Sequence, residues 1–428
     1  MEAIFSSLSG GHRLRGRVQQ LLDEVIAASA SRPVDVHIAT FSFTDEAIAA
    51  RLVDLVQRHP NVTVRIVADW SQGSDGGGRQ VAHLARLGLP NLLVRYKHDQ
   101  PYQWNAVEQR LRWSYHASRG LLHHKTLGVL IDGEPFMLLC GSYNWTEKAS
   151  NSYENILLLT AKDAGSRDLM RSMEWEFEAM WSDGRVTLSP DEARIHYRTI
   201  LAEYRNDPTM PAPSIVGIGA GRDHPLHAMA ADRLEGGDGP VIAFSSRSPH
   251  QTAAESGYAA VNRDRRLELG KPGGTTKCVP LTLSTLALDV IARARPGDTL
   301  RIAMYGLSAR VPEYGALLAA ARRGVALQIL LDGRVGQSML RRLAVLRGRE
   351  DVPIECRGTS RMMHEKYIVH AESDTVLTGT ANLSTDAVHR HSEQRLAIRG
   401  CPTLAAAFLA DFETIWARVS RPLTPVPA

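Results

Sequence analysis

The sequence predicts an α/β fold in which one structural unit occurs twice, and three observations support this prediction. The chain has 428 residues, a length that suits two domains of ordinary size. Apolar segments of strand length alternate with amphipathic segments of helix length, an order typical of an α/β sandwich with a mixed sheet. Several segments of the first half recur in the second half in the same order.

The repeated elements follow one another in the same order in both halves. Each half has a short Phe-Ser-Ser segment, a helix, an apolar strand, a second helix and a second strand that ends in Asp. The matched ranges are 3–7 and 243–246, 15–28 and 281–294, 36–41 and 300–305, 45–58 and 312–323, 62–69 and 325–332, and 176–181 and 411–416. We therefore predict an N-terminal repeat at 1–205 and a C-terminal repeat at 240–428, joined by a Pro- and Gly-rich linker at 206–239.

Composition and charge argue against several classes of protein. Hydrophobic residues make up 44% and charged residues 22% of the chain, which is typical of a globular protein and argues against long disorder. The sequence has no run of eighteen apolar residues, and residues 1–5 do not resemble the start of a secretory signal. The four cysteines lie far apart, so we expect no disulfide framework or zinc site and a reducing, cytoplasmic compartment.

Each half contains one cluster of residues suited to chemistry. A His-x-Lys pair precedes an apolar run, a Gly-[Ser/Thr]-x-Asn segment follows, and a Glu stands ten or eleven residues after the Asn. The first cluster consists of His123, Lys125, Ser142, Asn144 and Glu154, and the second of His364, Lys366, Thr380, Asn382 and Glu393. Recurrence of the whole pattern inside a duplicated fold argues against a chance origin.

The spacing within each cluster has a physical interpretation. Side chains two residues apart on a strand point to the same face, so the His and the Lys share a face, as do the hydroxyl and the amide. An ammonium, a hydroxyl and an amide suit the non-bridging oxygens of a phosphate. The imidazole suits attack or proton transfer, and the Glu suits holding that imidazole in one tautomer. We expect His124, which follows His123, to face the other way and to be structural.

This duplicated pattern resembles the phospholipase D superfamily, the HKD phosphodiesterases. The resemblance implies two phospholipase D-like αβα sandwich repeats, packed as a pseudo-twofold bilobal monomer with one active site at the seam. It also implies a reaction that needs no metal and no cofactor, in which one His attacks phosphorus and forms a covalent phosphohistidine. By the usual order in two-repeat members, His123 would attack and His364 would act as acid and base.

Two details qualify the resemblance. The first half is most similar to the nuclease-type branch, through residues 41–45, the His-His-Lys sequence, the segment Gly-Ser-Tyr-Asn-Trp-Thr and the pair Glu154-Asn155. The Asp that the family normally carries five residues after the Lys is displaced in the first half, where Asp132 stands at seven, and is replaced by Ala371 in the second.

An insert at 96–119 in the first half is the main candidate for substrate recognition, because it is aromatic and basic and leads into the first His-x-Lys pair. In one interpretation its aromatic side chains stack on a base while its arginines contact phosphates; the residues are Tyr102, Trp104, Arg110, Arg112 and Arg119. In a second, the aromatic side chains lie at lipid headgroup level. In a third, residues 107–115 form an amphipathic helix that packs on the domain.

Three classes of function follow. The favoured class is a nuclease acting on DNA or RNA, and the alternative is a peripheral phospholipase D or phosphatidyltransferase acting on phospholipid headgroups. A non-catalytic binding module is disfavoured, because both His-x-Lys pairs and both Asn are intact. Either enzyme takes a phosphodiester as its partner, and we expect a monomer because the pseudo-dimer is intramolecular.

Overall fold

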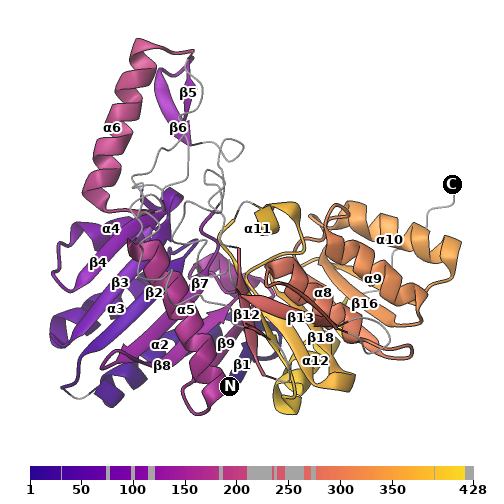
Figure 1. Cartoon of the computed structure of the whole chain (residues 1–428). Coiled ribbons are helices and arrows are strands. Elements are labelled where there is room, and N and C mark those ends of the chain that lie inside the picture. Colours follow the sequence, from indigo (N-terminus) through magenta and orange to yellow (C-terminus); the bar gives the residue numbers. More distant parts are fainter. Residues whose placement is uncertain are drawn as a thin grey trace.

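The computed structural model divides the chain into two lobes that lie side by side (Figure 1). It describes residues 1–29, 31–73, 78–97, 102–113, 121–182, 187–209, 234–235, 239–245, 265–270, 276–389 and 391–419. The first lobe runs from indigo to magenta in Figure 1, and the second from orange to yellow.

Each lobe is built on one large mixed sheet, and the two sheets have the same strand order. The first sheet follows the order β1 (Glu2–Phe5), β9 (Asn155–Thr160), β8 (Glu134–Gly141), β7 (Lys125–Ile131), β2 (Val34–Thr40), β3 (Val62–Asp69), β4 (Leu92–Lys97) and β10 (Thr187–Leu188). The second follows the order β12 (Val241–Phe244), β20 (Gln394–Ile398), β19 (Thr375–Gly379), β18 (Lys366–His370), β15 (Thr299–Met304), β16 (Ala326–Asp332) and β17 (Ile354–Thr359). Seven strands therefore correspond one to one, which confirms the predicted duplication of the fold.

Helices cover both faces of each sheet, so each lobe is an αβα sandwich. The outer faces carry α2 (Gly11–Ser29), α3 (Glu46–Arg58) and α4 (Gln80–Arg86) in the first lobe, and α8 (Leu283–Arg293), α9 (Pro312–Arg322) and α10 (Gln337–Glu350) in the second. The inner faces carry α5 (Ala164–Ser182) and α12 (Pro402–Arg418), whose apolar residues share one core with both sheets. This shared core holds the lobes together as one bilobal unit.

Local sequence explains where these elements begin and turn. The Asp45 carboxylate accepts hydrogen bonds from the backbone N–H groups of Ala47 and Ile48, and so caps α3. Gly141 and Gly379, from the two Gly-[Ser/Thr]-x-Asn segments, adopt φ values of 147° and 145°. A Cβ atom at either position would lie 2.4 Å from a carbonyl oxygen of the neighbouring strand. The glycine in this motif thus permits a close approach between strands.

The structure of the insert in the first lobe contradicts one of the three interpretations, the amphipathic helix. Residues 102–113 form an antiparallel hairpin of β5 (Tyr102–Asn105) and β6 (Arg110–Trp113), so the expected amphipathic helix is wrong there. The alternation Arg-Leu-Arg-Trp in β6 has the period of a strand, and Gln109 takes a left-handed φ of 51° at the turn. In Figure 1 the hairpin and α6 (Pro190–Asn206) project together from the first lobe.

The remaining elements are short. A small sheet of β11 (Leu234–Glu235), β13 (Arg266–Gly270) and β14 (Thr276–Pro280) takes its first strand from the predicted linker. The other helical segments are α1 (Ser6–Ser9), η1 (Trp70–Gly73), η2 (Glu147–Asn151), η4 (Ala371–Ser373) and α11 (Thr385–His389). Within the described ranges, no helix combines the length and the apolar character needed to cross a bilayer.

Candidate active site

The two His-x-Lys segments meet at the seam, where backbone hydrogen bonds join the lobes. The His123 N–H donates to the Ser392 carbonyl at 2.9 Å, and the His364 N–H donates to the Tyr153 carbonyl at 3.0 Å. Ser392 and Tyr153 each directly precede the Glu of their own cluster. The fold therefore presents each histidine to the Glu-bearing segment of the other lobe.

The carboxylates pair with the imidazoles across the seam. His123 Nδ1 lies 2.9 Å from Glu393 Oε2. His364 Nδ1 lies 3.0 Å from Glu154 Oε2 and 2.9 Å from Glu154 Oε1. The two imidazole rings face each other with centroids 6.4 Å apart. With Nδ1 engaged by a carboxylate, Nε2 is the nitrogen left to react on each ring.

A buried lysine stands beside each histidine. Lys125 Nζ donates to the His123 carbonyl at 2.7 Å, and Lys366 Nζ donates to the His364 carbonyl. Each ammonium also lies over an aromatic ring, Phe41 at 5.3 Å in the first lobe and Tyr305 at 5.6 Å in the second. The site thus holds two lysine side chains that are both buried.

Phe41 and Tyr305 are site residues that the sequence motifs did not identify. Each directly follows the first parallel strand of its lobe, and each ring contacts the local histidine edge to face, at 5.1 Å and 5.4 Å between centroids. Their matched places at the ends of the segments 36–41 and 300–305 were a usable signal, because the carboxyl ends of parallel strands commonly form the site in α/β folds.

The hydroxyl and amide groups of the two Gly-[Ser/Thr]-x-Asn segments make different contacts in the two lobes. Ser142 Oγ donates to Glu154 Oε2 at 2.6 Å, whereas Thr380 Oγ1 donates to Gln394 Oε1 at 3.0 Å. The Asn382 side-chain oxygen accepts from the Gly306 N–H at 3.2 Å.

The Asn144 side-chain oxygen is buried and has no hydrogen-bond partner within the part of the chain that the structure describes. The Ser142 hydroxyl, by contrast, is engaged in holding a carboxylate. An Asn amide would meet a phosphate through the Nδ2 donors, since its oxygen and the phosphate oxygens are all acceptors.

Burial sets the charge state of the site. Removal from water lowers the pKa of His123 well below its usual value, and the Lys125 and Lys366 ammonium groups add to this effect. Burial also lowers the pKa of Lys125 to about 7 and that of Lys366 to about 8. Burial raises the pKa of the Glu393 carboxyl to about 8, against the opposing effect of Lys125. An anion entering the site would favour the charged form of both lysines.

Two further pairs of matched residues position the loops. Asp69 Oδ2 accepts from the Leu122 N–H at 2.9 Å, and Asp332 Oδ2 accepts from the Met363 N–H at 3.2 Å. Both carboxylates stand at the ends of the second parallel strands, and each holds the residue before a histidine.

The matched serines of the Phe-Ser-Ser segments hold the carboxylate loops in the same way. Ser6 Oγ accepts from the Glu154 N–H at 2.9 Å, and Ser245 Oγ accepts from the Glu393 N–H at 2.7 Å. The segments that revealed the repeat thus support the site from both lobes.

The remaining candidates lie away from the reacting nitrogens or outside the described part. His124 is fully buried and faces α5, where Nε2 lies 3.4 Å from Glu176 Oε1 while Nδ1 contacts Gln394. The side chains of Tyr102 and Trp104 are outside the described residues, so their proposed stacking role remains a prediction from the sequence.

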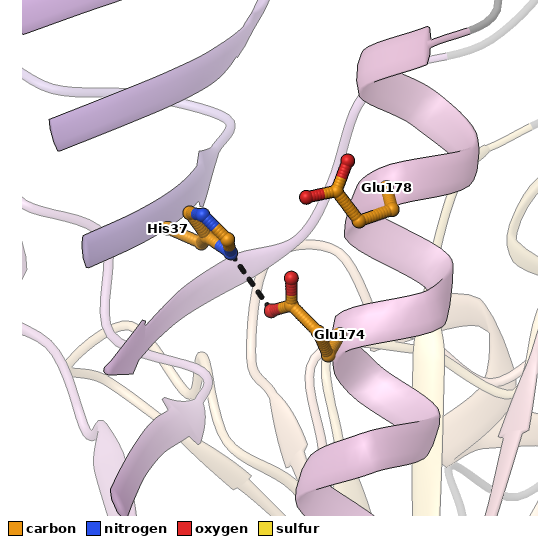
Figure 2. A group of neighbouring side chains, drawn as sticks. All are labelled: His37, Glu174 and Glu178. Carbon is orange, nitrogen blue, oxygen red and sulfur yellow. Dashed lines mark hydrogen bonds and ion pairs between the residues drawn. The ribbon is translucent and has the colours of Figure 1, made fainter. Parts of the chain in front are cut away.

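One group of potential metal ligands occurs in the described ranges, and it lies apart from the histidine pair. Figure 2 shows His37 on β2 facing Glu174 and Glu178 on α5, with ligand atoms all within 4.8 Å of one another. His37 Nδ1 lies 2.8 Å from Glu174 Oε2. Arg65 donates to His37 Nε2 at 2.9 Å and also to Glu178. The guanidinium therefore already serves as the cation of this cluster, which ties α5 to the sheet.

Comparisons with known proteins agree with this architecture. The family model described as cardiolipin synthase, PLD-like domain, matches the chain twice, at residues 24–181 and 287–416. The crystal structure of phosphatidylserine synthase from Haemophilus influenzae Rd KW20 is 13% identical, covers 98% of this chain and 87% of that chain, and has a TM-score of 0.58.

Two further structures match less well. The phospholipase D family member Nuc from Salmonella typhimurium is 26% identical over 32% of this chain and 90% of its own, with a TM-score of 0.28. Yeast tyrosyl-DNA phosphodiesterase is 11% identical over 85% and 82% of the two chains, with a TM-score of 0.39. No curated protein matches in a sequence search. Because the PLD-like model matches both lobes and more than half of the residues, the chain belongs to the phospholipase D superfamily.

Proposed function

We propose that this chain cleaves a phosphodiester through a covalent phosphohistidine, without a metal ion, and that its substrate is a nucleic acid. The observation that carries the proposal is the crossed arrangement at the seam. Two imidazoles face each other, each is held at Nδ1 by the carboxylate of the other lobe, and a buried lysine flanks each one. This set supplies a nucleophile, an acid and two cations within one small site.

The first step would form the covalent intermediate. His123 Nε2 attacks phosphorus and forms a P–N bond, while the P–O bond to the leaving group breaks. The His364 imidazolium gives its Nε2 proton to the departing oxygen. Lys125 and Lys366 stabilise the negative charge that develops on the non-bridging oxygens.

The second step would release the product. His364, now neutral, takes a proton from water, and the resulting hydroxide oxygen bonds to phosphorus while the P–N bond breaks. This returns His123 to its free form and His364 to the imidazolium, so that atoms and protons balance over the cycle. An alcohol in place of water would give transfer instead of hydrolysis.

The contacts of the carboxylates support the assignment of His123 as the nucleophile. Burial lowers the pKa of His364, and Glu154, which approaches that ring with both oxygens, opposes this effect. Glu393 approaches His123 with one oxygen, and the pKa of that carboxyl is raised to about 8 by burial. One contact stabilises an imidazolium less than two contacts do, which suits the neutral His123 ring that attack requires.

The hairpin supports a nucleic acid over a lipid surface. Its tip exposes Glu108, Gln109 and Arg110 beside the apolar residues Ala106 and Val107. Charged and amide side chains at this tip suit a polar partner better than insertion at lipid headgroup level. A sequence pI of about 8.9 suits attraction to a polyanion.

Two expectations about the whole protein remain part of the proposal. The four cysteines are all free thiols in the structure, which supports a reducing, cytoplasmic compartment. The shared core between lobes supports a monomer with repeats at 1–205 and 240–428, and light scattering in solution would test the monomer.

A matched assay in chelator tests the proposal. Wild-type protein and the His123→Ala variant would each meet single- and double-stranded oligonucleotides, and vesicles of phosphatidylcholine or phosphatidylglycerol. We expect oligonucleotide cleavage that depends on His123 and survives chelation. Headgroup release alone would establish the phospholipase D alternative, and activity that disappears in chelator and returns with magnesium would reject the proposed mechanism.

A further inference from the structure

The loops that carry the two histidines are held alike at most positions. In each loop, the residue before the histidine donates its N–H to a strand-end Asp, and the histidine N–H donates to a carbonyl of the other lobe. The residue two positions before the histidine uses its carbonyl to accept from the other lobe, Leu121 from Ser392 at 2.8 Å and Met362 from Tyr153 at 2.8 Å. These three bonds are repeated by the pseudo-twofold symmetry.

A fourth bond occurs only in the His123 loop. The Leu121 N–H donates to His391 Nδ1 across the seam at 3.0 Å. At the matched place in the other loop, no side chain accepts from the Met362 N–H within the described residues, and Ser152 stands where the second lobe has His391. The two lobes therefore differ in chemistry immediately beside their reacting histidines.

His391 also contacts the reacting ring itself. Its side chain is 9% exposed, and its ring centroid lies 5.9 Å from that of His123 at an angle of 40°. His391 is two residues from Glu393, so one segment of the second lobe holds both the backbone and the imidazole of the His123 loop. Because Nδ1 accepts the Leu121 N–H, the proton of the neutral His391 ring lies on Nε2.

We propose that His391 is a positioning residue that clasps the His123 loop from the opposite lobe and sets His123 for attack. The inference rests on the proposed function, since it assigns a purpose to the geometry of that same site. It gives a purpose to the third imidazole beside His123, whose matched position near His364 is Ser152. The clasp is the hydrogen bond from the Leu121 N–H to residue 391. It therefore requires a hydrogen-bond acceptor at the place of His391 Nδ1.

Two substitutions separate this role from simple packing. His391→Asn keeps a carbonyl oxygen near the place of Nδ1, whereas His391→Gln moves its carbonyl oxygen toward the place of Nε2. Hydrogen exchange resolved to the Leu121 amide reports on the clasp directly. We expect the amide to exchange at near the wild-type rate in the Asn variant and about fivefold faster in the Gln variant, the effect of one lost hydrogen bond. Equal exchange in the two variants would overturn the proposal.

Turnover of bis(p-nitrophenyl) phosphate extends the test to catalysis. We expect the Gln variant to lose about tenfold in kcat with little change in KM, and the Asn variant to recover most of that loss, because a misplaced nucleophile slows chemistry more than binding. Similar losses in both variants would overturn the positioning role. A wild-type protein with no turnover on any phosphodiester would reject the proposed function, and the exchange measurement would still decide the clasp.

A measurement on the wild-type protein covers the case in which the Gln variant fails to fold. The ¹⁵N chemical shifts of the His391 ring report which nitrogen carries the proton. We expect the Nε2–H tautomer, and an Nδ1–H tautomer would contradict the clasp. His391→Ser, which places the first lobe's residue at this position, should behave as the Gln variant does.

Discussion

The two lobes are nearly alike in front of the His-x-Lys segments, on the side where the two histidines meet. They differ behind these segments, on the side of α5 and α12. In front, each lobe contributes a histidine, a lysine, an aromatic ring and a strand-end Asp with matching contacts. Behind the first His-x-Lys pair, His124 lies near Glu176 of α5. Behind the second, Glu365 is fully buried and feels the Asp411 carboxyl of α12. The groups around the two histidines therefore match between the lobes, whereas the charged groups behind the His-x-Lys segments differ.

The carboxylates that face the histidines also differ between lobes. Glu154 contacts His364 with two oxygens and accepts from Ser142, whereas Glu393 contacts His123 with one oxygen and its other oxygen has no partner within the described ranges. Glu154 and Glu393 therefore occupy nearly symmetric positions but make different contacts, which is compatible with different roles for the two histidines.

Removing either histidine gives the largest expected effect. We expect His123→Ala and His364→Ala each to lower kcat by about ten-thousand-fold or more, because each removes a group that forms or breaks a bond to phosphorus or hydrogen. The two variants should differ in one respect. With bis(p-nitrophenyl) phosphate, whose leaving group needs no acid, His364→Ala should accumulate a covalent adduct on His123, detectable by intact mass spectrometry. An adduct on His364 in the His123→Ala variant would reverse the assigned roles.

Neutralising the two carboxylates should give unequal losses. We expect Glu154→Gln to lower kcat by about a hundredfold at pH 7, because it removes the charge that stabilises the His364 imidazolium. Glu393→Gln should cost about tenfold or less at that pH, because burial raises the pKa of Glu393 to about 8 and a carboxyl below its pKa is already neutral. Steady-state kinetics at pH 7 would measure both variants. Equal losses would show that the two carboxylates act alike.

The motifs predicted much of this site, because the same residues recur at the same places of a duplicated fold. The sequence expected both His-x-Lys pairs on strands and a Glu at each imidazole, whereas the structure starts β7 and β18 at the lysines and leaves each histidine just before its strand. The sequence could not predict that Glu393 holds His123 and Glu154 holds His364. Each pairing joins residues of different lobes, so it depends on how the lobes pack against each other. Tyr305 and His391 were missed for a related reason, because only the tertiary fold brings them to the histidines. The insert hairpin was left open between three interpretations, since short apolar-aromatic runs are ambiguous in period.

Anion binding should weaken as pH rises, with the first lobe affected before the second. Burial lowers the pKa of Lys125 to about 7 and of Lys366 to about 8, so both ammonium groups lose protons between pH 7 and 9. We expect dimethyl phosphate, a diester that does not titrate in this range, to bind about tenfold more weakly at pH 9 than at pH 7. Calorimetry in buffers of different ionisation enthalpy should detect proton uptake on binding near pH 8. Affinity that does not change with pH would show that neither lysine contacts the anion.

The smallest expected effect concerns the layer behind the site. Glu365 is fully buried, and burial followed by repulsion from Asp411 raises its pKa well above the usual value, so the folded protein holds a proton there at neutral pH. A raised carboxyl pKa contributes stability that is complete below the unfolded pKa near 4.5 and is lost as pH rises toward the folded pKa. Gln at this position keeps a donor toward Asp411 and never ionises.

The melting temperature of Glu365→Gln relative to wild type should therefore rise with pH, by about 2 °C between pH 5 and pH 8. Glu176→Gln is the matched control in the first lobe, where the carboxylate lies 3.4 Å from the His124 imidazole. It should show no such gain with pH. A difference in melting temperature that is constant from pH 5 to pH 8 in the Glu365→Gln variant would mean that Glu365 carries no proton of its own. The asymmetry behind the site would then be one of shape alone.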